Sequence, residues 1–417
     1  MRLLGKLEKQ IAKREFFLQT DPIRLFKVTF IAMPNYDFVL NSKLPKVGTT
    51  IFTKMSALAQ KTGAVNLSQG FPDFDVDPQL LKLVSKYMAA GFNQYAPMAG
   101  ALDLREAIAA KIERLYSAQY NVENEITVTA GATQAIFSAI SALIVEGDEV
   151  IIFTPAYDCY EPAIDINGGK TIFVNLKSPN YKVDWSEVKR LVSRKTKMII
   201  LNTPHNPTGS IWDKQDMEEL AHLTKGTGII LLSDEVYEHI IFENKEHQSV
   251  LKHKELRDRA LVVASFGKTF HVTGWKLGYI VGPSSIMKEF KKVHQFNVFC
   301  CNHPMQLAIA SYINNEENYL HLGSFYEEKR NLFNEAAVQS RFDVLPSSGT
   351  YFQLLDYSRI TNEDDVQFAE RLTEEFKIAS IPVSVFYNTP DTNKVLRFCF
   401  AKENETLERA GEILLKI

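Results

Sequence analysis

The amino-acid sequence predicts an α/β fold in which helices cover both faces of a mostly parallel sheet. From residue 126 to residue 281, short apolar runs that are typical of buried strands recur along the chain. Several of these runs are separated by stretches with helical periodicity, such as 133–145 and 214–224. This alternation indicates strand–helix–strand units, and such units build parallel sheets that are buried on both faces.

The predicted strands are Ile126–Thr129, Val150–Thr154, Met198–Asn202, Ile229–Ser233, Leu261–Ser265 and Tyr279–Val281. Open sheets of this kind bind ligands outside the carboxyl ends of their strands. The residues that directly follow these strands are therefore the first candidates for a binding site. Other predicted elements are a short strand at Val65 and helices at 50–62, 78–90 and 101–116.

After the predicted sheet the regular alternation of strands and helices ends, which indicates a second, smaller domain. Long helical patterns dominate there, and Gly349–Leu355 and Leu396–Phe400 predict a short sheet. We expect a large domain over 76–303. The smaller α+β domain would cover 304–417, together with part of an N-terminal arm at 33–75.

Composition and charge are ordinary for a soluble globular protein. The 417 residues carry a formal net charge of −3, and 45% are hydrophobic and 23% charged. This balance offers no basic footprint for nucleic acid, and the apolar run Ala135–Val145 is too short to span a bilayer. The four cysteines include no CxxC pair, which favours reduced thiols over a disulfide framework or a zinc site. We therefore expect a cytoplasmic protein with no metal, nucleic-acid or membrane partner.

Residues 1–32 form an unusual N-terminal extension. They hold seven Lys/Arg against three Asp/Glu, a charge of +4 that leaves −7 for the rest of the chain. They contain no uninterrupted apolar core of signal-peptide type, and their acidic residues argue against an organellar presequence. The simplest hypothesis is a non-native extension with the natural start at Met33.

The segment 260–276 combines a buried strand with two lysines. Ser265 ends the apolar run Ala260–Ala264, Lys268 follows three residues later, and Lys276 follows eight residues after that. A lysine at the end of a buried strand is costly to charge, so its pKa falls or it acquires a covalent partner. Schiff-base chemistry requires such a lysine. Taken alone, this segment is equally compatible with a solvated lysine in a strand-to-helix turn.

Other predicted strand ends also carry groups suited to a ligand. Gly131 opens a helix, where backbone N–H groups can bind an anion. Asn206, in Asn-Pro-Thr-Gly, places an amide at the sheet edge, and Asp234 and Tyr237 follow an apolar strand in Ser-Asp-Glu-Val-Tyr. Taken singly, each of these features also has a purely structural interpretation. The turns can be plain connections, Asp234 can be a helix N-cap, and Tyr237 can be an ordinary packing residue.

Together these motifs resemble the fold-type-I pyridoxal-phosphate (PLP) aminotransferases. Asn-Pro-Thr-Gly, Ser-Asp-Glu-Val-Tyr, and Ser-Phe-Gly-Lys-Thr followed by Gly-Trp-Lys occur in the order of that family. The resemblance runs from about Asn41 to the C-terminus and is nearest to the methionine aminotransferases and to the kynurenine aminotransferase and glutamine transaminase K subgroup. It implies a mostly parallel seven-stranded sheet between helices, a smaller α+β domain, and PLP as cofactor. The implied reaction moves an α-amino group from an amino acid to a 2-oxo acid by a ping-pong mechanism.

The resemblance also implies roles around the cofactor. Lys268 would form the Schiff base with PLP and move the proton between the substrate Cα and the cofactor. Asp234 would keep the pyridine nitrogen protonated, which makes the ring an electron sink. Asn206 and Tyr237 would donate hydrogen bonds to the 3′-oxygen, and Tyr157 would stack on the ring.

A phosphate cradle is implied as well, consisting of Gly131, Ala132, Thr133, Ser265 and Lys276. Lys276 supplies charge without the bidentate fork of the arginine that the family often has there. Tyr95 matches a tyrosine that reaches the phosphate of the neighbouring subunit, so the resemblance implies a homodimer.

Substrate recognition would rest on two further matches. Arg397 corresponds to the arginine that clamps the substrate α-carboxylate with a bidentate pair, and Gly70 would lie near the same carboxylate. No second arginine for a distal carboxylate is apparent. Aromatic residues in 292–299, 349–352 and 381–386 instead predict an apolar side-chain pocket, which favours methionine, aromatic amino acids, histidine, glutamine or kynurenine as donors.

Two other functions are compatible with parts of this pattern. A cysteine-S-conjugate or cystathionine-type β-lyase would share Lys268, Asp234, Asn206 and Tyr237, because the two reactions diverge only after Cα deprotonation. A regulator with an aminotransferase-like ligand domain would need a DNA-binding module, for which the first 40 residues are too short. The sequence therefore favours the aminotransferase.

Overall fold

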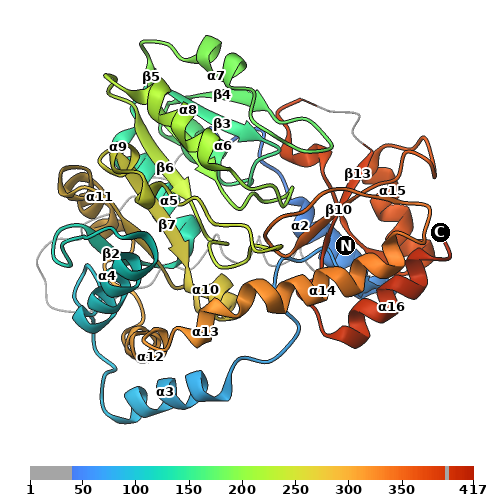
Figure 1. Cartoon of the computed structure of the whole chain (residues 1–417), viewed down its shortest axis with the longest axis horizontal. Helices are drawn as coiled ribbons and strands as arrows, with labels where there is room; N and C mark the ends of the chain where they lie inside the picture. Colours follow the sequence, from blue (N-terminus) through green and yellow to red (C-terminus); the bar gives the residue numbers. More distant parts are fainter. Residues whose placement is uncertain (1–39, 390–393) are drawn as a thin grey trace, which may run out of the picture. The chain divides into compact units, whose positions relative to one another are not determined.

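The computed structural model of the chain describes residues 40–389 and 394–417. Lys43–Ile417 form one compact unit, whose main sheets and their helices are drawn in Figure 1. The predicted extension at 1–32 and the start at Met33 lie outside the described residues.

A seven-stranded sheet organises most of this unit. Its strands lie in the order β2 (Ile126–Thr129), β8 (Gly278–Val281), β7 (Ala260–Ser265), β6 (Ile230–Asp234), β5 (Thr196–Asn202), β3 (Glu149–Thr154) and β4 (Lys170–Asn175). Strand β8 runs antiparallel to β2 and β7, and all other neighbours are parallel. The predicted mostly parallel sheet is confirmed.

Helices cover both faces of this sheet because successive side chains of a strand point to opposite sides. The covering helices are α4 (Leu102–Tyr116), α5 (Gly131–Leu143), α6 (Tyr160–Ile166), α8 (Lys214–Thr224) and α11 (Ser284–Asn297). Helices α5, α6 and α11 share a hydrophobic cluster with Ile152 and Ile200, whereas α4 and α8 share another with Ile151 and Ile199. Burial on both sides accounts for the continuous apolar runs of these strands.

A second, antiparallel sheet lies in the C-terminal part of the chain. Its order is β12 (Ile381–Pro382), β13 (Val395–Cys399), β10 (Phe352–Asp356) and β9 (Asp343–Val344). Helices α14 (Leu322–Ala337) and α16 (Asn404–Leu414), orange and red in Figure 1, lie beside each other. The short strand β1 (Val65–Asn66) pairs with β11 (Ile378–Ala379). The Cys399 N–H also donates to the Leu67 carbonyl at 2.8 Å, so the segment that leads to Gly70 lies beside β13.

The remaining α-helices of the described residues are α2 (Ile51–Thr62), α3 (Pro78–Ala89), α7 (Trp185–Leu191), α9 (Lys254–Arg257), α10 (Phe266–Thr269), α12 (His303–Ile313), α13 (Glu317–Leu320) and α15 (Asp365–Arg371). Helix α12 packs against α3 and α4. The predicted domain boundaries at 76 and 303 stay predictions.

Two elements differ from the predictions. Strand β4 was not predicted, because this edge strand is only partly buried and has a lysine and an asparagine at its ends in place of a continuous apolar run. Helix α5 begins at Gly131 and not at Thr133. The earlier start places Gly131 and Ala132 within the first turn of the helix.

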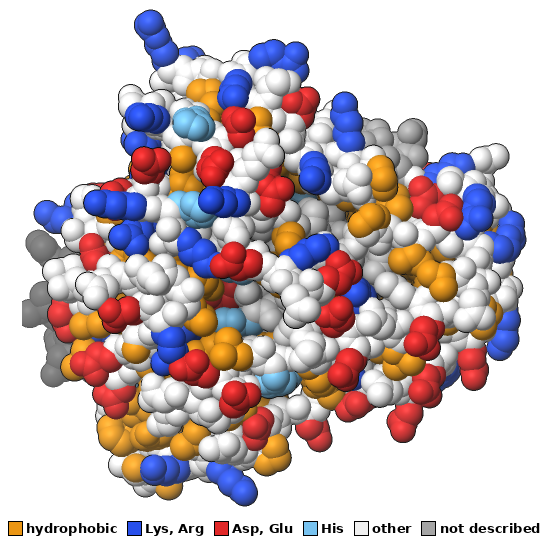
Figure 2. Space-filling model, in the orientation of Figure 1, with side chains coloured by type: hydrophobic (Ala, Val, Ile, Leu, Met, Phe, Trp, Pro, Cys, Tyr) orange, Lys and Arg blue, Asp and Glu red, His pale blue; other side chains and the backbone are white. Residues whose placement is uncertain are grey.

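The surface shows no strong charge segregation on the face drawn in Figure 2. Lys/Arg and Asp/Glu side chains are interspersed there, without a broad basic area. Within residues 40–389 and 394–417, no helix combines the length and the apolar character needed to cross a membrane.

Candidate active site

One cavity at the carboxyl ends of the central strands brings together most of the predicted site residues. Those that line it are Gly131, Ala132, Thr133, Tyr157, Asn206, Asp234, Tyr237, Ser265, Lys268 and Lys276. They lie at the ends of β2, β3, β5, β6 and β7 or in the segments that follow these strands. The strand ends therefore meet where the rule for parallel sheets expects a ligand.

The start of α5 forms an anion-binding wall of this cavity. Gly131 has φ +77°, which favours glycine, and a Cβ placed there would lie 3.4 Å from Nζ of Lys276. The first N–H groups of a helix have no partner within the helix. The ammonium of Lys276 makes no hydrogen bond or ion pair with any described residue. A free cation beside free N–H groups at a helix N-terminus suits a phosphate.

Asp234 is buried at the end of β6 and is held by two donors. Its Oδ2 accepts a hydrogen bond of 2.6 Å from the Tyr160 hydroxyl, and its Oδ1 accepts one of 3.3 Å from the Val236 N–H. Burial raises the pKa of Asp234 to about 6, against the opposing effects of the Tyr160 hydrogen bond and the Lys268 ammonium. Most of these carboxyl groups are therefore ionised at neutral pH, as pairing with a protonated ring nitrogen requires.

Lys268 lies in the single-turn helix α10, directly after β7. Its Nζ donates to the Gly70 carbonyl at 3.1 Å and to the Tyr351 hydroxyl at 2.7 Å, and that hydroxyl in turn donates to the Gly70 carbonyl at 2.5 Å. Burial lowers the pKa of Lys268 to about 8, and nearby cations act in the same direction. An amine with a lowered pKa is available as a nucleophile near neutral pH.

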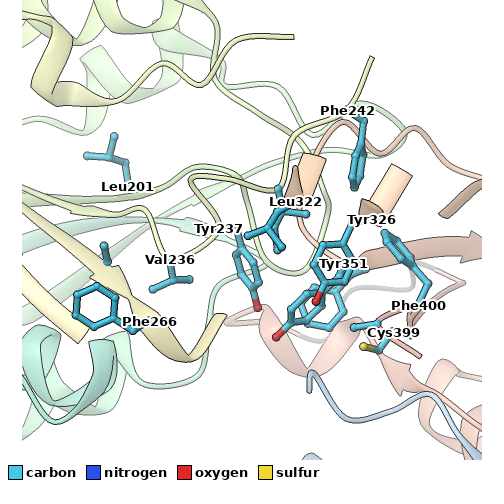
Figure 3. Packing of buried hydrophobic residues seen from close by; sticks show 14 of the residues in the cluster. Leu201, Val236, Tyr237, Phe242, Phe266, Leu322, Tyr326, Tyr351, Cys399 and Phe400 are labelled. Carbon is cyan, nitrogen blue, oxygen red and sulfur yellow. The ribbon is translucent and has the colours of Figure 1, made fainter. Parts of the chain in front are cut away.

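Two tyrosines surround this amine. Tyr237 and Tyr351 lie side by side in Figure 3, with ring centroids 5.1 Å apart and planes nearly perpendicular. The Nζ of Lys268 lies 5.7 Å from the ring centroid of Tyr237 and 5.3 Å from that of Tyr351. Because Tyr351 directly precedes β10, the second sheet contributes to the surroundings of the amine.

Arg397 is a buried cation that has no carboxylate partner among the described residues. It is 1% exposed, and its guanidinium donates to Asn206 Oδ1 at 2.8 Å and to the Ser68 carbonyl at 3.1 Å. Its Nε has no hydrogen-bond partner, and among the described residues it makes no ion pair. Leaving a buried charge unpaired is costly, so this guanidinium suits an anionic ligand. The bond to Oδ1 also leaves the NH₂ group of Asn206 available as a donor.

Two residues near the cavity were not predicted, Asn202 and Tyr160, whereas Tyr351 was predicted only as part of the aromatic segment 349–352. Asn202 connects two strand ends, because its Nδ2 donates to the Asp234 carbonyl at 2.8 Å and its Oδ1 accepts from the Asn206 N–H at 2.8 Å. Its place as the last residue of an apolar strand was an available signal. No signal indicated the bond of Tyr160 to Asp234 or that of Tyr351 to Lys268, because these partners lie 74 and 83 residues apart in the sequence.

Three predicted residues do not line the cavity. Gly70 and Arg397 adjoin it through Lys268 and Asn206 respectively. Tyr95 is 81% exposed, and its ring meets that of Phe299 edge-on at 5.4 Å. It therefore does not reach the cavity of its own chain.

Two of the three segments predicted to form an apolar side-chain pocket place aromatic rings beside Arg397, and the pocket itself stays a prediction. Phe352 and Phe386, from 349–352 and 381–386, have ring centroids 3.9 Å and 5.5 Å from Cζ of Arg397. Residues 292–299 do not contribute aromatic rings to the cavity of this chain. Phe296 is 88% exposed, because the end of α11 turns this side chain towards solvent.

The donor set of the cavity fits PLP. Lys268 offers a primary amine for an aldehyde, Asp234 a carboxylate for a pyridinium, and Asn206 and Tyr237 donors for a phenolic oxygen. The glycine wall beside Lys276 would be narrowed by any side chain at position 131. An amine, a carboxylate and an anion site in one cavity match the three functional parts of this cofactor.

Comparison with known proteins agrees with this chemistry. The family model described as "Aminotransferase class I and II" matches residues 62–414. The chain is 50% identical over 386 residues to a methionine aminotransferase of Escherichia coli (strain K12), which covers 92% of this chain and 100% of the relative. It is 32% identical over 435 residues to a kynurenine–oxoglutarate transaminase of Dictyostelium discoideum, covering 94% and 100%. A solved Escherichia coli structure identified with a methionine aminotransferase function matches with a TM-score of 0.90 and 50% identity, covering 91% of this chain and 100% of that one.

Proposed function

Because the chain belongs to the class I and II aminotransferases, we propose that it moves the α-amino group of methionine, or of another apolar or aromatic amino acid, to a 2-oxo acid. The chain has the fold of the fold-type-I PLP enzymes, and its cofactor is PLP. The observation that carries the reaction class is the Lys268 amine, which has a lowered pKa and lines the same cavity as the buried Asp234 carboxylate.

Each residue of the cavity has a definite task in this proposal. When bound, PLP supplies an electron sink for the charge that develops at the substrate Cα. Lys268 holds the cofactor through its amine and, once released, removes and returns the Cα proton. Asp234 keeps the ring nitrogen protonated, and Asn206 and Tyr237 donate to the ring oxygen. Tyr157 covers the ring.

An exposed cation holds the phosphate, and a buried cation holds the substrate carboxylate. Exposed Lys276 and the first N–H groups of α5 hold the phosphate, with Ser265. Buried Arg397 holds the α-carboxylate, so that every α-amino acid presents its Cα in the same place. The site works in two half-reactions, in which the first 2-oxo acid leaves before the second binds.

The preference for apolar donors is supported by the surroundings of Arg397 and by the relatives. The rings of Phe52, Phe352 and Phe386 have centroids within 5.5 Å of its Cζ. The 50% identical relative is a methionine aminotransferase. A kynurenine or glutamine transaminase is the second candidate, because a 32% identical relative is a kynurenine–oxoglutarate transaminase.

Three further features belong to the proposal. The chain forms a homodimer in which Tyr95 reaches the phosphate of the partner, and its 81% exposure supports that role. The protein is cytoplasmic, in keeping with its four free cysteines. Residues 76–303 form the PLP-binding domain and 304–417 the smaller domain.

The visible absorption of the purified protein tests the function directly. We expect a PLP band that disappears when L-methionine is added without an acceptor, with 4-methylthio-2-oxobutanoate formed once per site. The Lys268→Ala variant serves as the control, and it should fold and show no transamination. A band that changes only with kynurenine or glutamine moves the substrate to the second candidate. A protein that takes up no PLP contradicts the proposal.

A further inference from the structure

His294 is a fully buried histidine that connects α5, whose start forms the phosphate cradle, with the loop that contains Met98. It lies in α11 and is 0% exposed. Its Nδ1 lies 3.2 Å from Nε2 of Gln134 in α5, and its Nε2 lies 3.2 Å from the carbonyl oxygen of Met98. This side chain takes no direct part in the proposed reaction.

The neighbours of His294 determine which of its nitrogens carries the hydrogen. The Oε1 of Gln134 accepts a hydrogen bond of 2.9 Å from the Ala130 N–H, so the NH₂ group of Gln134 faces the imidazole. One of its N–H donors goes to Ser138 Oγ at 2.8 Å, which leaves the other for Nδ1 of His294. Nδ1 is therefore the acceptor, and Nε2 carries the hydrogen that it donates to Met98. Burial lowers the pKa of His294 and favours this neutral form.

At one end of this hydrogen-bonded connection, Gln134 determines which backbone N–H groups remain free to bind the phosphate. Ala130 directly precedes α5, and the Gln134 side chain satisfies its N–H. The N–H groups of Gly131, Ala132 and Thr133 follow, and the start of a helix offers them no carbonyl partner. Gln134 thus occupies the N–H of Ala130 and leaves the three N–H groups that follow it for the phosphate.

The Met98 end belongs to residues 94–101, here called the Tyr95 loop. This loop packs closely on β2, because the Val128 N–H donates to the Ala99 carbonyl at 2.9 Å. A Cβ on Gly100, whose φ is +102°, would come within 2.4 Å of the Val128 side chain. The loop that presents Tyr95 therefore lies against the strand that leads into the cradle.

We infer that His294 is a positioning residue that fixes the phosphate cradle and the Tyr95 loop relative to each other. This inference rests on the proposed function, because the phosphate concerned is that of PLP. In the proposed homodimer one His294 acts on two cofactors. It acts on that of its own subunit through Gln134, and on that of the partner through the Tyr95 loop.

Variants of His294 in the full-length protein test the inference by two measurements other than activity. These are the dissociation constant of PLP and the ³¹P chemical shift of the bound phosphate. His294→Leu removes both hydrogen bonds, and we expect PLP to bind about tenfold more weakly, the loss expected for one or two neutral hydrogen bonds. We also expect its ³¹P shift to move. His294→Gln keeps one acceptor and one donor, and should stay close to the wild type in both measurements.

A double-variant comparison separates the two ends of the connection. Tyr95→Phe and His294→Leu should be non-additive in PLP affinity if His294 acts partly through the Tyr95 loop. Should His294→Leu fail to fold, Gln134→Met breaks the same connection from α5 and should move the ³¹P shift in the same way.

The outcomes distinguish this inference from the proposed function. An altered ³¹P shift in His294→Leu, restored in His294→Gln, supports it. A wild-type protein that binds PLP beside a His294→Leu variant with unchanged affinity and shift overturns the inference alone. Weaker binding with an unchanged shift also overturns it, because that result is a general loss of structure. A wild-type protein that binds no PLP overturns the proposed function and the inference together.

Discussion

The hydroxyl of Tyr160 donates a hydrogen bond of 2.6 Å to Asp234, joining the start of the helix after β3 to the last residue of β6. Burial raises the pKa of Asp234 to about 6, and the Tyr160 hydrogen bond opposes that rise. The ionisation of the carboxylate at neutral pH therefore depends on a residue outside the Ser-Asp-Glu-Val-Tyr motif.

Replacing Tyr160 by phenylalanine should shift the acid limb of the pH–rate profile to higher pH. The variant loses a donor to the charged form of Asp234, so the pKa of this carboxyl should rise further, by about one unit for a hydrogen bond to a charged group. The pH profile of the methionine half-reaction should then lose rate at a pH about one unit higher than in the wild type. At pH 8 and above the two rates should converge. An acid limb at the wild-type position would show that Tyr160 does not tune Asp234.

The motif residues were predictable because their signals are local. Asp234 ends an apolar strand and Lys268 follows the end of another by three residues. Parallel strands bring their carboxyl ends to one edge whatever the rest of the chain does. The contacts of Tyr160 with Asp234 and of Tyr351 with Lys268 were not predictable, because a tyrosine near a strand does not reveal a partner more than 70 residues away. The exposure of Phe296 in the single chain was not predictable either. An aromatic residue in a helix indicates burial on average, and here the helix end exposes it.

The predictability of the fold likewise depended on whether the signal was local or came from distant parts of the sequence. Strands buried on both faces have continuous apolar runs and were predicted, whereas β4 at the sheet edge has mixed composition and was missed. The antiparallel direction of β8 was also not predictable in detail. The direction of β8 depends on how the chain returns from α10 to lie along β7, and the spacing of apolar residues carries no information about that path.

Replacing Arg397 by lysine should separate carboxylate recognition from cofactor binding. The variant keeps a positive charge but loses the fork that can form two parallel hydrogen bonds to a carboxylate. We expect kcat/KM for methionine to fall about a hundredfold or more, chiefly through KM, while the PLP band stays. The amine 3-(methylthio)propylamine, which lacks the carboxylate, is the matched substrate. The wild type should strongly prefer methionine over it, and the variant should lose most of that preference. An unchanged KM for methionine would remove Arg397 from the substrate site.

Replacing Lys111 by methionine should destabilise the protein without touching the cavity. Lys111 and Glu238 form a buried ion pair of 2.5 Å, and Glu238 also accepts a hydrogen bond from the Tyr116 hydroxyl. Removing the ammonium leaves a buried carboxylate without its counter-ion, at a cost of about 3–5 kcal/mol. The thermal midpoint of unfolding should fall clearly, and the double variant with Glu238→Gln should recover part of the loss.

The exposed ion pair between Lys214 and Glu218 is the matched control for this prediction. Its atoms are 3.9 Å apart on the solvent side of α8. Lys214→Met should change the stability by less than about 0.5 kcal/mol. Equal effects of the two lysine variants would mean that burial of the Lys111 pair contributes nothing.

Replacing Lys268 by methionine should stabilise the cofactor-free protein, and the gain should depend on pH. The pKa of Lys268 is lowered to about 8 in the folded chain, chiefly by burial, from an ordinary value of 10.5. Between these two pH values the unfolded chain binds more protons at this site than the folded chain. The contribution of Lys268 to the free energy of unfolding therefore rises with pH in this window. Below pH 8 the amine is charged in both states and the folded protein bears the full cost of burying it, about 3 kcal/mol at most.

The difference in unfolding free energy between Lys268→Met and wild type should thus be largest at pH 7 and shrink steadily towards pH 10. Urea unfolding of both proteins, stripped of PLP and measured across this range, gives the comparison. Other groups that titrate in alkali act on both proteins alike and cancel in the difference. A difference that stays constant from pH 7 to pH 10 would mean that the folded chain does not perturb the Lys268 amine. The basis for assigning it as the nucleophile would then be lost.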